Sequence, residues 1–166
     1  MSASNITQVQ SHRDYRPSGS QIFILIYTFR EQPRGYYGFV IKTHRGDLSA
    51  DHGGVAHRRL CRLGVVCNAI LDAFGRVEEG ARSRVTLFTE VKNLAARIRK
   101  GCVCADLGCY RIVREAGRVI EQVTVEVISP EDNSQARELA RRTRIAEMIA
   151  NATAPGPGIQ GNKKVQ

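Results

Sequence analysis

The run from residue 84 to residue 98 constrains the fold more than any other part of the sequence. Residues 85–89 have the β-branched and apolar composition of a buried strand, and Glu90 follows them at once. Residues 91–100 then carry apolar side chains at helical spacing. A strand that ends in a carboxylate and turns directly into a helix predicts a sheet covered by helices, with Glu90 as a candidate site residue at the sheet edge.

Size and composition indicate one folded domain between two tails. The 166 residues are 42% hydrophobic, which suffices for a single core. Residues 1–20 and 151–166 are poor in large apolar side chains and are predicted to be disordered, so the domain is expected to span residues 21–150. The odd number of five cysteines, with no secretory signal, predicts an intracellular protein of the cytoplasm or nucleus.

The chain is strongly basic. Lys and Arg total 25 against 16 Asp and Glu, and most of the formal charge of +9 lies within residues 21–150. A basic body favours an anionic partner such as nucleic acid, and a merely solubilising surface is the alternative. The longest wholly apolar run, residues 22–27, falls far short of the roughly 20 residues of a membrane-spanning helix, so no membrane association is expected.

Periodicity predicts nine elements. Strands are expected at 21–28, 36–44, 48–51, 85–89 and 119–128, with a loop at 30–35 and a turn at Gly53–Gly54. Helices are expected at 56–74, 91–100, 106–116 and 134–150, the last after a turn and N-cap at 129–133. This order predicts an α/β fold: a mixed five-stranded sheet that opens with an antiparallel hairpin and carries helices on both faces. The inward face of the last helix is predicted to comprise Ala136, Leu139, Ala140, Thr143, Ala146 and Ile149.

Three stretches resemble ribonuclease H domains of the cellular and retroelement type. Residues 26–29 (Ile-Tyr-Thr-Phe) with 36–41 resemble the opening hairpin of that family, and 87–90 (Leu-Phe-Thr-Glu) resemble its strand end. Residues 123–127 followed by 136–141 (Ala-Arg-Glu-Leu-Ala-Arg) resemble its final strand and helix. The resemblance covers residues 21–150 and implies an RNase H-like fold.

The same resemblance implies that the catalytic acids are degenerate. Active family members hold two Mg²⁺ ions with four carboxylates, and the matching positions here are Phe29, Cys61 (or Leu63), Glu90 and Arg137. Mg²⁺ requires oxygen ligands, so one remaining carboxylate cannot assemble a two-metal site. The His-containing loop of the family is also shortened to residues 129–133, which contain no His. We therefore expect neither hydrolysis nor a bound cofactor.

Arg137 suggests what replaces the metal. One hypothesis is that its guanidinium reaches Glu90 across the former metal site and holds the strand end to the last helix by an ion pair. The alternative is that Arg137 is an exposed helix residue in line with Arg141 and Arg144.

Basic side chains on the helices predict a nucleic-acid surface. In the family that the chain resembles, the corresponding helices flank the groove for an RNA-containing duplex, and guanidinium groups suit phosphate oxygens. Ordinary solvated helix faces are the alternative. The predicted binding residues are Arg58, Arg59, Arg62, Lys92, Arg97, Arg99, Lys100, Arg137 and Arg141.

The cysteine-rich segment 102–109 is the closest approach to a metal motif. Cys102, Cys104 and Cys109 could bind Zn²⁺ if a fourth ligand joined them, but the spacing is not that of a standard finger. Free cysteines are usually small buried hydrophobic residues, so we predict no metal here.

Together these patterns predict a catalytically inactive RNase H-like protein that binds double-stranded RNA or an RNA:DNA hybrid. Fold analogy suggests an origin in a retroelement or a role as a viral accessory protein, such as a silencing suppressor. One alternative is a protein-interaction module similar to the degenerate connection domains beside retroelement polymerases. Another is residual metal-dependent nuclease activity, which would require Glu90.

Overall fold

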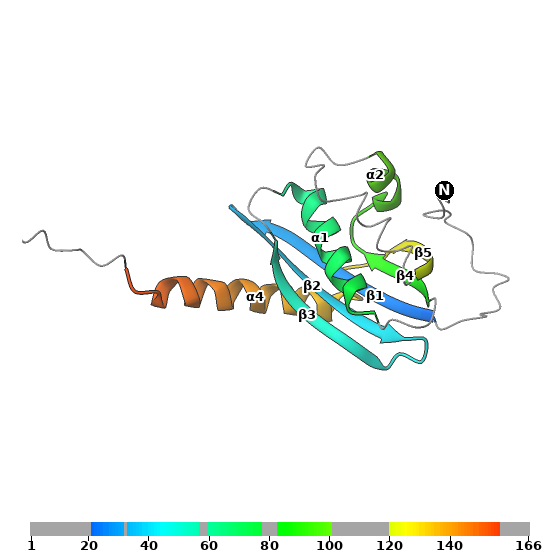
Figure 1. Cartoon of the computed structure of the whole chain (residues 1–166), viewed down its shortest axis with the longest axis horizontal. Coiled ribbons are helices and arrows are strands. Elements are labelled where there is room, and N and C mark those ends of the chain that lie inside the picture. The colour runs from blue at the N-terminus through cyan, green and yellow to red at the C-terminus, as the bar shows by residue number, and fades with distance from the viewer. Residues whose placement is uncertain (1–20, 32, 57–59, 78–82, 101–119, 157–166) are drawn as a thin grey trace, which may run out of the picture.

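The computed structural model describes residues 21–31, 33–56, 60–77, 83–100 and 120–156. Two layers of helices enclose one sheet (Figure 1). In chain order the elements are β1 (Gln21–Glu31), β2 (Arg34–Thr43), β3 (Leu48–Ala56), α1 (Arg62–Gly75), β4 (Ser83–Thr89), α2 (Leu94–Lys100), β5 (Ile120–Val127) and α4 (Ser134–Thr153).

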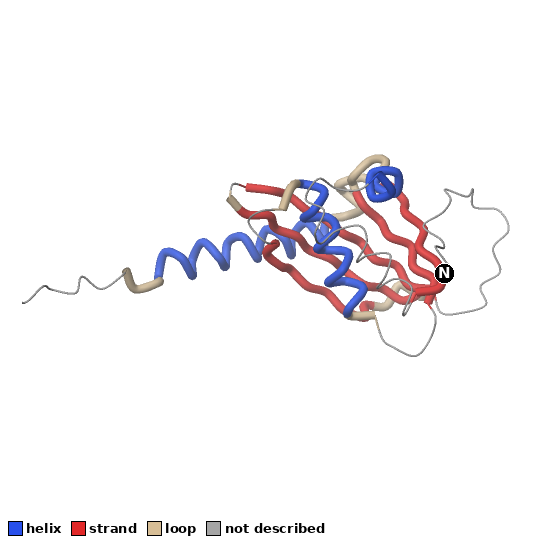
Figure 2. The backbone as a smooth tube through the Cα atoms, turned by 45° about the horizontal axis from the view of Figure 1, so that its top comes forward, coloured by secondary structure: helices blue, strands red, loops and turns tan. Residues whose placement is uncertain are grey.

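The sheet has five strands in the order β3-β2-β1-β4-β5. The β1–β2 and β2–β3 pairs are antiparallel, whereas β1–β4 and β4–β5 are parallel. Figure 2 shows the strands, in red, side by side in one sheet. Parallel pairing places the carboxyl ends of β1, β4 and β5 at one edge, with Ile26 opposite Thr89 and Thr89 opposite Val127. The predicted α/β fold with a mixed five-stranded sheet and a hairpin start is therefore confirmed.

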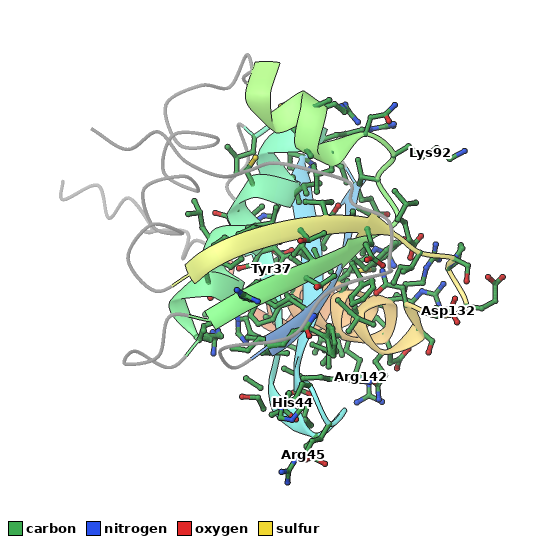
Figure 3. All side chains as sticks on the ribbon, turned by 90° about the vertical axis from the view of Figure 1, so that its right-hand side faces the viewer. Tyr37, His44, Arg45, Lys92, Asp132 and Arg142 are labelled. Carbon is green, nitrogen blue, oxygen red and sulfur yellow. The ribbon has the colours of Figure 1, made fainter. Side chains whose placement is uncertain are left out.

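Helices cover both faces, as predicted. Figure 3 looks along the sheet, with α1 and α2 on one side and α4 on the other. Two glycines of β2 lie where α1 and α4 pack against the sheet. A Cβ on Gly35 would overlap the side chain of Val65 in α1, and one on Gly38 would lie 2.8 Å from the amide nitrogen of Ala140 in α4.

The main core lies between the sheet and the α1 face. Ile24 and Ile26 of β1 and Leu87 of β4 are almost fully buried in one cluster with α1 residues such as Ile70 and Phe74. The α4 face is thinner, because the fully buried Ala136 and Ala140 allow the helix to lie directly on the β2 backbone.

The strands extend further than the sequence predicted. The first strand continues through Arg30 to Glu31 and the second begins at Arg34, so the loop expected at 30–35 is shorter than predicted. The third strand reaches Ala56, so the turn expected at Gly53–Gly54 is wrong. Gly53 instead packs against α4, where the carbonyl oxygen of Leu139 would be 2.7 Å from an added Cβ. Glycine at this position permits close packing rather than chain reversal.

Two helices begin later than predicted. The helix expected from Ala56 begins at Arg62, because Ala56 still belongs to β3. The helix expected from Val91 begins at Leu94, since Asn93 adopts a left-handed backbone (φ 57°) that a continuous helix excludes. The helix predicted at 106–116 lies outside the described residues. The strand predicted at 119–128 is β5.

The last helix is longer than predicted and its end is exposed. α4 runs to Thr153, three residues into the predicted tail, and extends past the sheet (Figure 1). Ala136 and Ala140 are buried and Leu139 and Thr143 half-buried, as their inward prediction requires, but Ala146 and Ile149 are exposed. Their inward assignment is therefore wrong. Among the described helices, none is long and apolar enough to cross a membrane.

Candidate nucleic-acid interface

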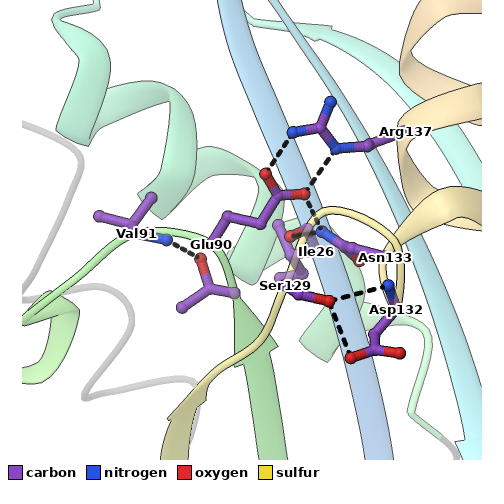
Figure 4. A network of polar contacts seen from close by, with 8 residues as sticks. Ile26, Glu90, Val91, Ser129, Asp132, Asn133 and Arg137 are labelled. Carbon is purple, nitrogen blue, oxygen red and sulfur yellow. Dashed lines mark hydrogen bonds and ion pairs between the residues drawn. The ribbon is translucent and has the colours of Figure 1, made fainter.

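Glu90 lies where β4 leaves the sheet. The hydroxyl of Thr89 accepts a hydrogen bond from the Val91 amide at 3.1 Å, which turns the chain immediately after the strand. The Glu90 carboxylate then projects toward the start of α4 (Figure 4). The carboxylate predicted at this sheet edge is therefore present, and it points toward α4.

Arg137 of α4 holds this carboxylate with two hydrogen bonds. Its Nε donates to Oε1 of Glu90 at 2.8 Å, and its Nη2 donates to Oε2 at 2.5 Å (Figure 4). The Arg137 bonds are the main reason that the pKa of Glu90 falls below its ordinary value. Of the two alternatives for Arg137, the structure has the ion pair with Glu90, and both oxygens of Glu90 are engaged.

Asn133 completes the contact and was not predicted as a site residue. Its fully buried side chain donates from Nδ2 to the Ile26 carbonyl at 2.9 Å and to Oε1 of Glu90 at 3.0 Å. The sequence indicated an N-cap here, and Asn133 does occupy that position, but within the described structure its side chain makes no capping bond. It instead ties β1, β4 and α4 together, a role that local sequence gives no signal for.

An aromatic side chain of β1 borders the ion pair. The Arg137 guanidinium lies 4.5 Å from the Tyr27 ring centroid, a cation–π distance. Phe29, on the same strand, stacks on Tyr36 with ring centroids 5.2 Å apart. Ile26 accepts a hydrogen bond from Asn133 and Tyr27 contacts Arg137, and both precede the Phe29 position inferred from the resemblance.

A second set of polar contacts fixes α4 further along its length. Arg144 donates from Nε to Oε2 of Glu31 and from Nη2 to Oε1 of Glu31, the second bond at 2.7 Å. These bonds lower the pKa of Glu31. Glu147 accepts a hydrogen bond from the Tyr36 hydroxyl at 2.5 Å and forms an ion pair with Arg34. Burial, followed by the Glu147 contact, raises the pKa of Tyr36 to about 12.

A cavity of about 440 Å³ lies on the α1 side of the same sheet edge. It opens between the end of β1, the first turn of α1 and the start of α2. Phe29 and Leu63, both positions that the resemblance assigns to former acids, line it. The complete lining among the described residues is Thr28, Phe29, Arg30, Arg62, Leu63, Val66, Val91 and Arg97.

The charged side chains of this cavity are all basic. Arg30, Arg62 and Arg97 line it, and none of its described lining residues is a carboxylate. The nearby acidic residues Glu31 and Glu90 are bonded to Arg144 and Arg137 of α4. Within the described part of the chain, no group of three or more His, Cys, Asp or Glu residues could hold a metal ion. The arrangement suits an anion with apolar substituents.

The structure gathers only some of the predicted binding residues. Arg62 and Arg97 meet at the cavity, where Arg30 joins them, although the sequence placed Arg30 in a loop. Lys92 extends into solvent from the turn before α2 (Figure 3), and Arg141 is exposed on α4. The remaining predicted residues lie outside the part of the chain that the structure describes: Arg58, Arg59, the side chains of Arg99 and Lys100, and Cys102, Cys104 and Cys109.

Cys61 has a structural role. It is the N-cap of α1, and its sulfur accepts a hydrogen bond from the Gly64 amide at 3.4 Å. A thiol here takes the place of the hydroxyl or carboxylate that commonly caps a helix. Cys61 thus begins the helix whose first residue, Arg62, lines the cavity.

The solved structures that this chain resembles include several ribonucleases H. The chain is similar to RNase H1 of the archaeon Halobacterium salinarum NRC-1 (TM-score 0.59, 12% identity, 76% of this chain and 98% of that chain). It is also similar to the N-terminal RNase H domain of a Mycobacterium tuberculosis protein (0.61, 13%, 80% and 99%). A third is LC11-RNase H1 in complex with an RNA/DNA hybrid (0.58, 12%, 76% and 99%). No protein-family model and no curated protein matches the sequence.

These similarities establish an RNase H-like fold. They span nearly the whole of each compared chain, so the likeness extends to the architecture as a whole. At 12–13% identity they show the fold alone, and the function of this chain depends on its own side chains.

Proposed function

We propose that this chain is a non-catalytic RNase H-like protein that binds double-stranded RNA or an RNA:DNA hybrid. The observation that carries the proposal is the charge of the sheet edge. Glu90 is neutralised by Arg137, and the adjacent cavity presents Arg30, Arg62 and Arg97 without a carboxylate among its described lining residues. Such an edge attracts phosphate oxygens and repels the divalent cations that two-metal hydrolysis requires.

The absence of hydrolysis is part of the proposal. Two-metal catalysis needs several carboxylate oxygens that are available to the ions. Both oxygens of Glu90 accept hydrogen bonds from Arg137, and Asn133 donates a further bond. A metal would have to displace a bidentate guanidinium before it could reach Glu90.

Duplex binding is tested by a salt titration. Fluorescence anisotropy of labelled dsRNA, hybrid and dsDNA of equal length, with single strands for comparison, is measured between low and physiological salt. Phosphate contacts release counterions, so affinity should fall steeply as the salt concentration rises. Each phosphate contact that a substitution removes should reduce the slope of log K against log salt concentration by about 0.7–0.9. Replacing Arg30, Arg62 and Arg97 together by Gln should weaken binding, whereas Arg45→Gln, in the exposed β2–β3 turn, is the control.

Residual nuclease activity is the competing enzymatic function, since the compared structures are RNase H enzymes by name. It is tested by incubating the hybrid with Mg²⁺ or Mn²⁺ and the wild-type chain or Glu90→Gln. We expect intact RNA in every reaction. Metal-dependent cleavage that disappears in Glu90→Gln would overturn the non-catalytic proposal.

A protein-interaction module is the second candidate function. It is favoured by the exposed end of α4, where Ile145, Met148 and Ile149 are 51–59% exposed. Apolar side chains at this helical spacing are typical of a helix that packs against another chain. A second copy is the first occupant to test: sedimentation should show self-association that is lost when all three become Ser. If the chain is monomeric at every concentration and still binds duplexes, self-association is rejected and nucleic-acid binding is the function that remains.

We place this activity in the biology of a retroelement or virus, where a duplex-binding protein can mask RNA from silencing or sensing. The support is analogy of fold and basic charge, so the binding assays above come first.

A further inference from the structure

We propose that the cavity lined by Arg30, Arg62 and Arg97 binds the terminal phosphate of a nucleic-acid strand. This inference rests on the proposed function and narrows it from the phosphate backbone in general to a phosphate monoester at a strand end. Two observations carry it: the basic side chains that line the cavity, and its size together with its apolar lining.

The charge favours a dianion. The three guanidinium groups come from three separate elements, β1, α1 and α2, and none has a carboxylate partner among the described residues. An internal phosphodiester carries one negative charge, whereas a phosphate monoester carries about −1.5 to −2 at neutral pH and presents three acceptor oxygens. Three cationic side chains around one cavity are therefore matched better by a strand end than by its middle.

The helix on the opposite face keeps these cations available. Glu31 directly follows Arg30 in β1, so its side chain faces the opposite side of the sheet, and Glu90 lies at the end of the adjacent strand. Arg144 and Arg137 of α4 bind these two carboxylates. Because the acids are paired across the sheet edge, the positive charge on the α1 side is left for a ligand.

The size and floor suit the nucleotide attached to that phosphate. About 440 Å³ lies within the range of small-ligand sites, which are largely apolar with a few placed polar groups. Leu63, Val66 and Val91 provide the apolar surface, and Thr28 adds a hydroxyl.

The test compares duplexes that differ only in their end groups. Three otherwise identical dsRNA molecules, with 5′-hydroxyl, 5′-phosphate or 3′-phosphate ends, are titrated with the full chain at one ionic strength. We expect at least about fivefold tighter binding of one phosphorylated duplex, and the favoured end identifies the strand polarity. The preference should vanish in Arg62→Gln and in Arg97→Gln, both checked for folding by circular dichroism, and persist in Arg45→Gln.

The outcomes separate this inference from the proposed function. Equal affinity for all three duplexes would overturn the terminal-phosphate site while leaving duplex binding intact. If no duplex binds, the proposed function fails, and a titration of the ¹⁵N-labelled chain with adenosine 5′-monophosphate decides the inference alone. Saturable shifts at β1, α1 and α2 would support the site, and their absence would reject it.

Discussion

The Arg137 guanidinium lies between the Glu90 carboxylate, to which it donates two hydrogen bonds, and the Tyr27 ring, 4.5 Å from its centroid. The contact joins α4, β4 and β1 at the edge where the carboxyl ends of the parallel strands meet. A fixed organic cation thus stabilises this edge by means that need no metal. The stability of the folded chain should therefore depend on this contact.

Removing Arg137 should destabilise the fold. Arg137→Ala leaves a half-buried carboxylate without its main partner, and we expect a loss on the order of 2 kcal/mol in the free energy of unfolding, since the pair is only partly exposed. Arg141→Ala, on the exposed face of the same helix, should change it by less than about 0.5 kcal/mol. Urea unfolding of both variants measures the difference. Equal losses of unfolding free energy in the two variants would mean that the Arg137–Glu90 ion pair does not stabilise the fold.

The same pair should make stability depend on acid pH. The pKa of Glu90 is lowered from its ordinary value of 4.5, chiefly by Arg137, so the folded state favours the carboxylate. This contribution is present above pH 4.5 and is lost as the pH falls through the lowered folded pKa. Unfolding free energies measured from neutral to acid pH should therefore decline more steeply for the wild type than for Glu90→Gln. Parallel curves would contradict the assignment.

Two tyrosines should titrate late. Burial, with the Glu147 contact, raises the pKa of Tyr36 to about 12, and burial, with the Asp72 contact, also raises the pKa of Tyr37. Because the folded state favours the neutral phenols, their contribution is present below pH 10 and is lost as the pH rises through the raised values. Absorbance at the phenolate band should show a late phase that shrinks in Tyr36→Phe. A single transition of all five tyrosines near pH 10 would contradict it.

Gly38 should not tolerate a side chain. An added Cβ would overlap the Ala136 carbonyl oxygen and lie 2.8 Å from the Ala140 amide nitrogen, so α4 would have to move off the sheet. We expect Gly38→Ala to cost about 2–3 kcal/mol. Gly75→Ala is the matched control, because no atom of the described structure lies within 4 Å of its added Cβ. Thermal unfolding compares the two, and a stable Gly38→Ala protein would show that α4 is loosely docked.

Excess divalent metal should leave the protein unchanged. Since Arg137 occupies both Glu90 oxygens, neither Mg²⁺ nor Mn²⁺ should raise the melting temperature in a saturable way. Differential scanning fluorimetry with and without chelator makes the measurement. A saturable increase that is absent in Glu90→Gln would reveal a metal site.

The sequence by itself determined the order of elements and the kind of sheet. The apolar strand composition of β1 and β2, and the helical spacing of α1 and α4, are local patterns that each segment carries independently of its neighbours. The resemblance to a family whose corresponding positions converge also suggested the Arg137–Glu90 pair, but it left open the alternative that Arg137 is an exposed helix residue.

Only the tertiary structure decided how these segments meet. It showed that Arg30 joins Arg62 and Arg97 at one cavity, and that Asn133 bonds to Ile26 and Glu90. It also showed that the end of α4 extends beyond the described strands (Figure 1). The strand glycines were likewise misassigned to a turn, because the requirement for Gly53 comes from a helix much later in the chain. Contacts between distant segments depend on how elements pack, and local periodicity carries no information about that packing.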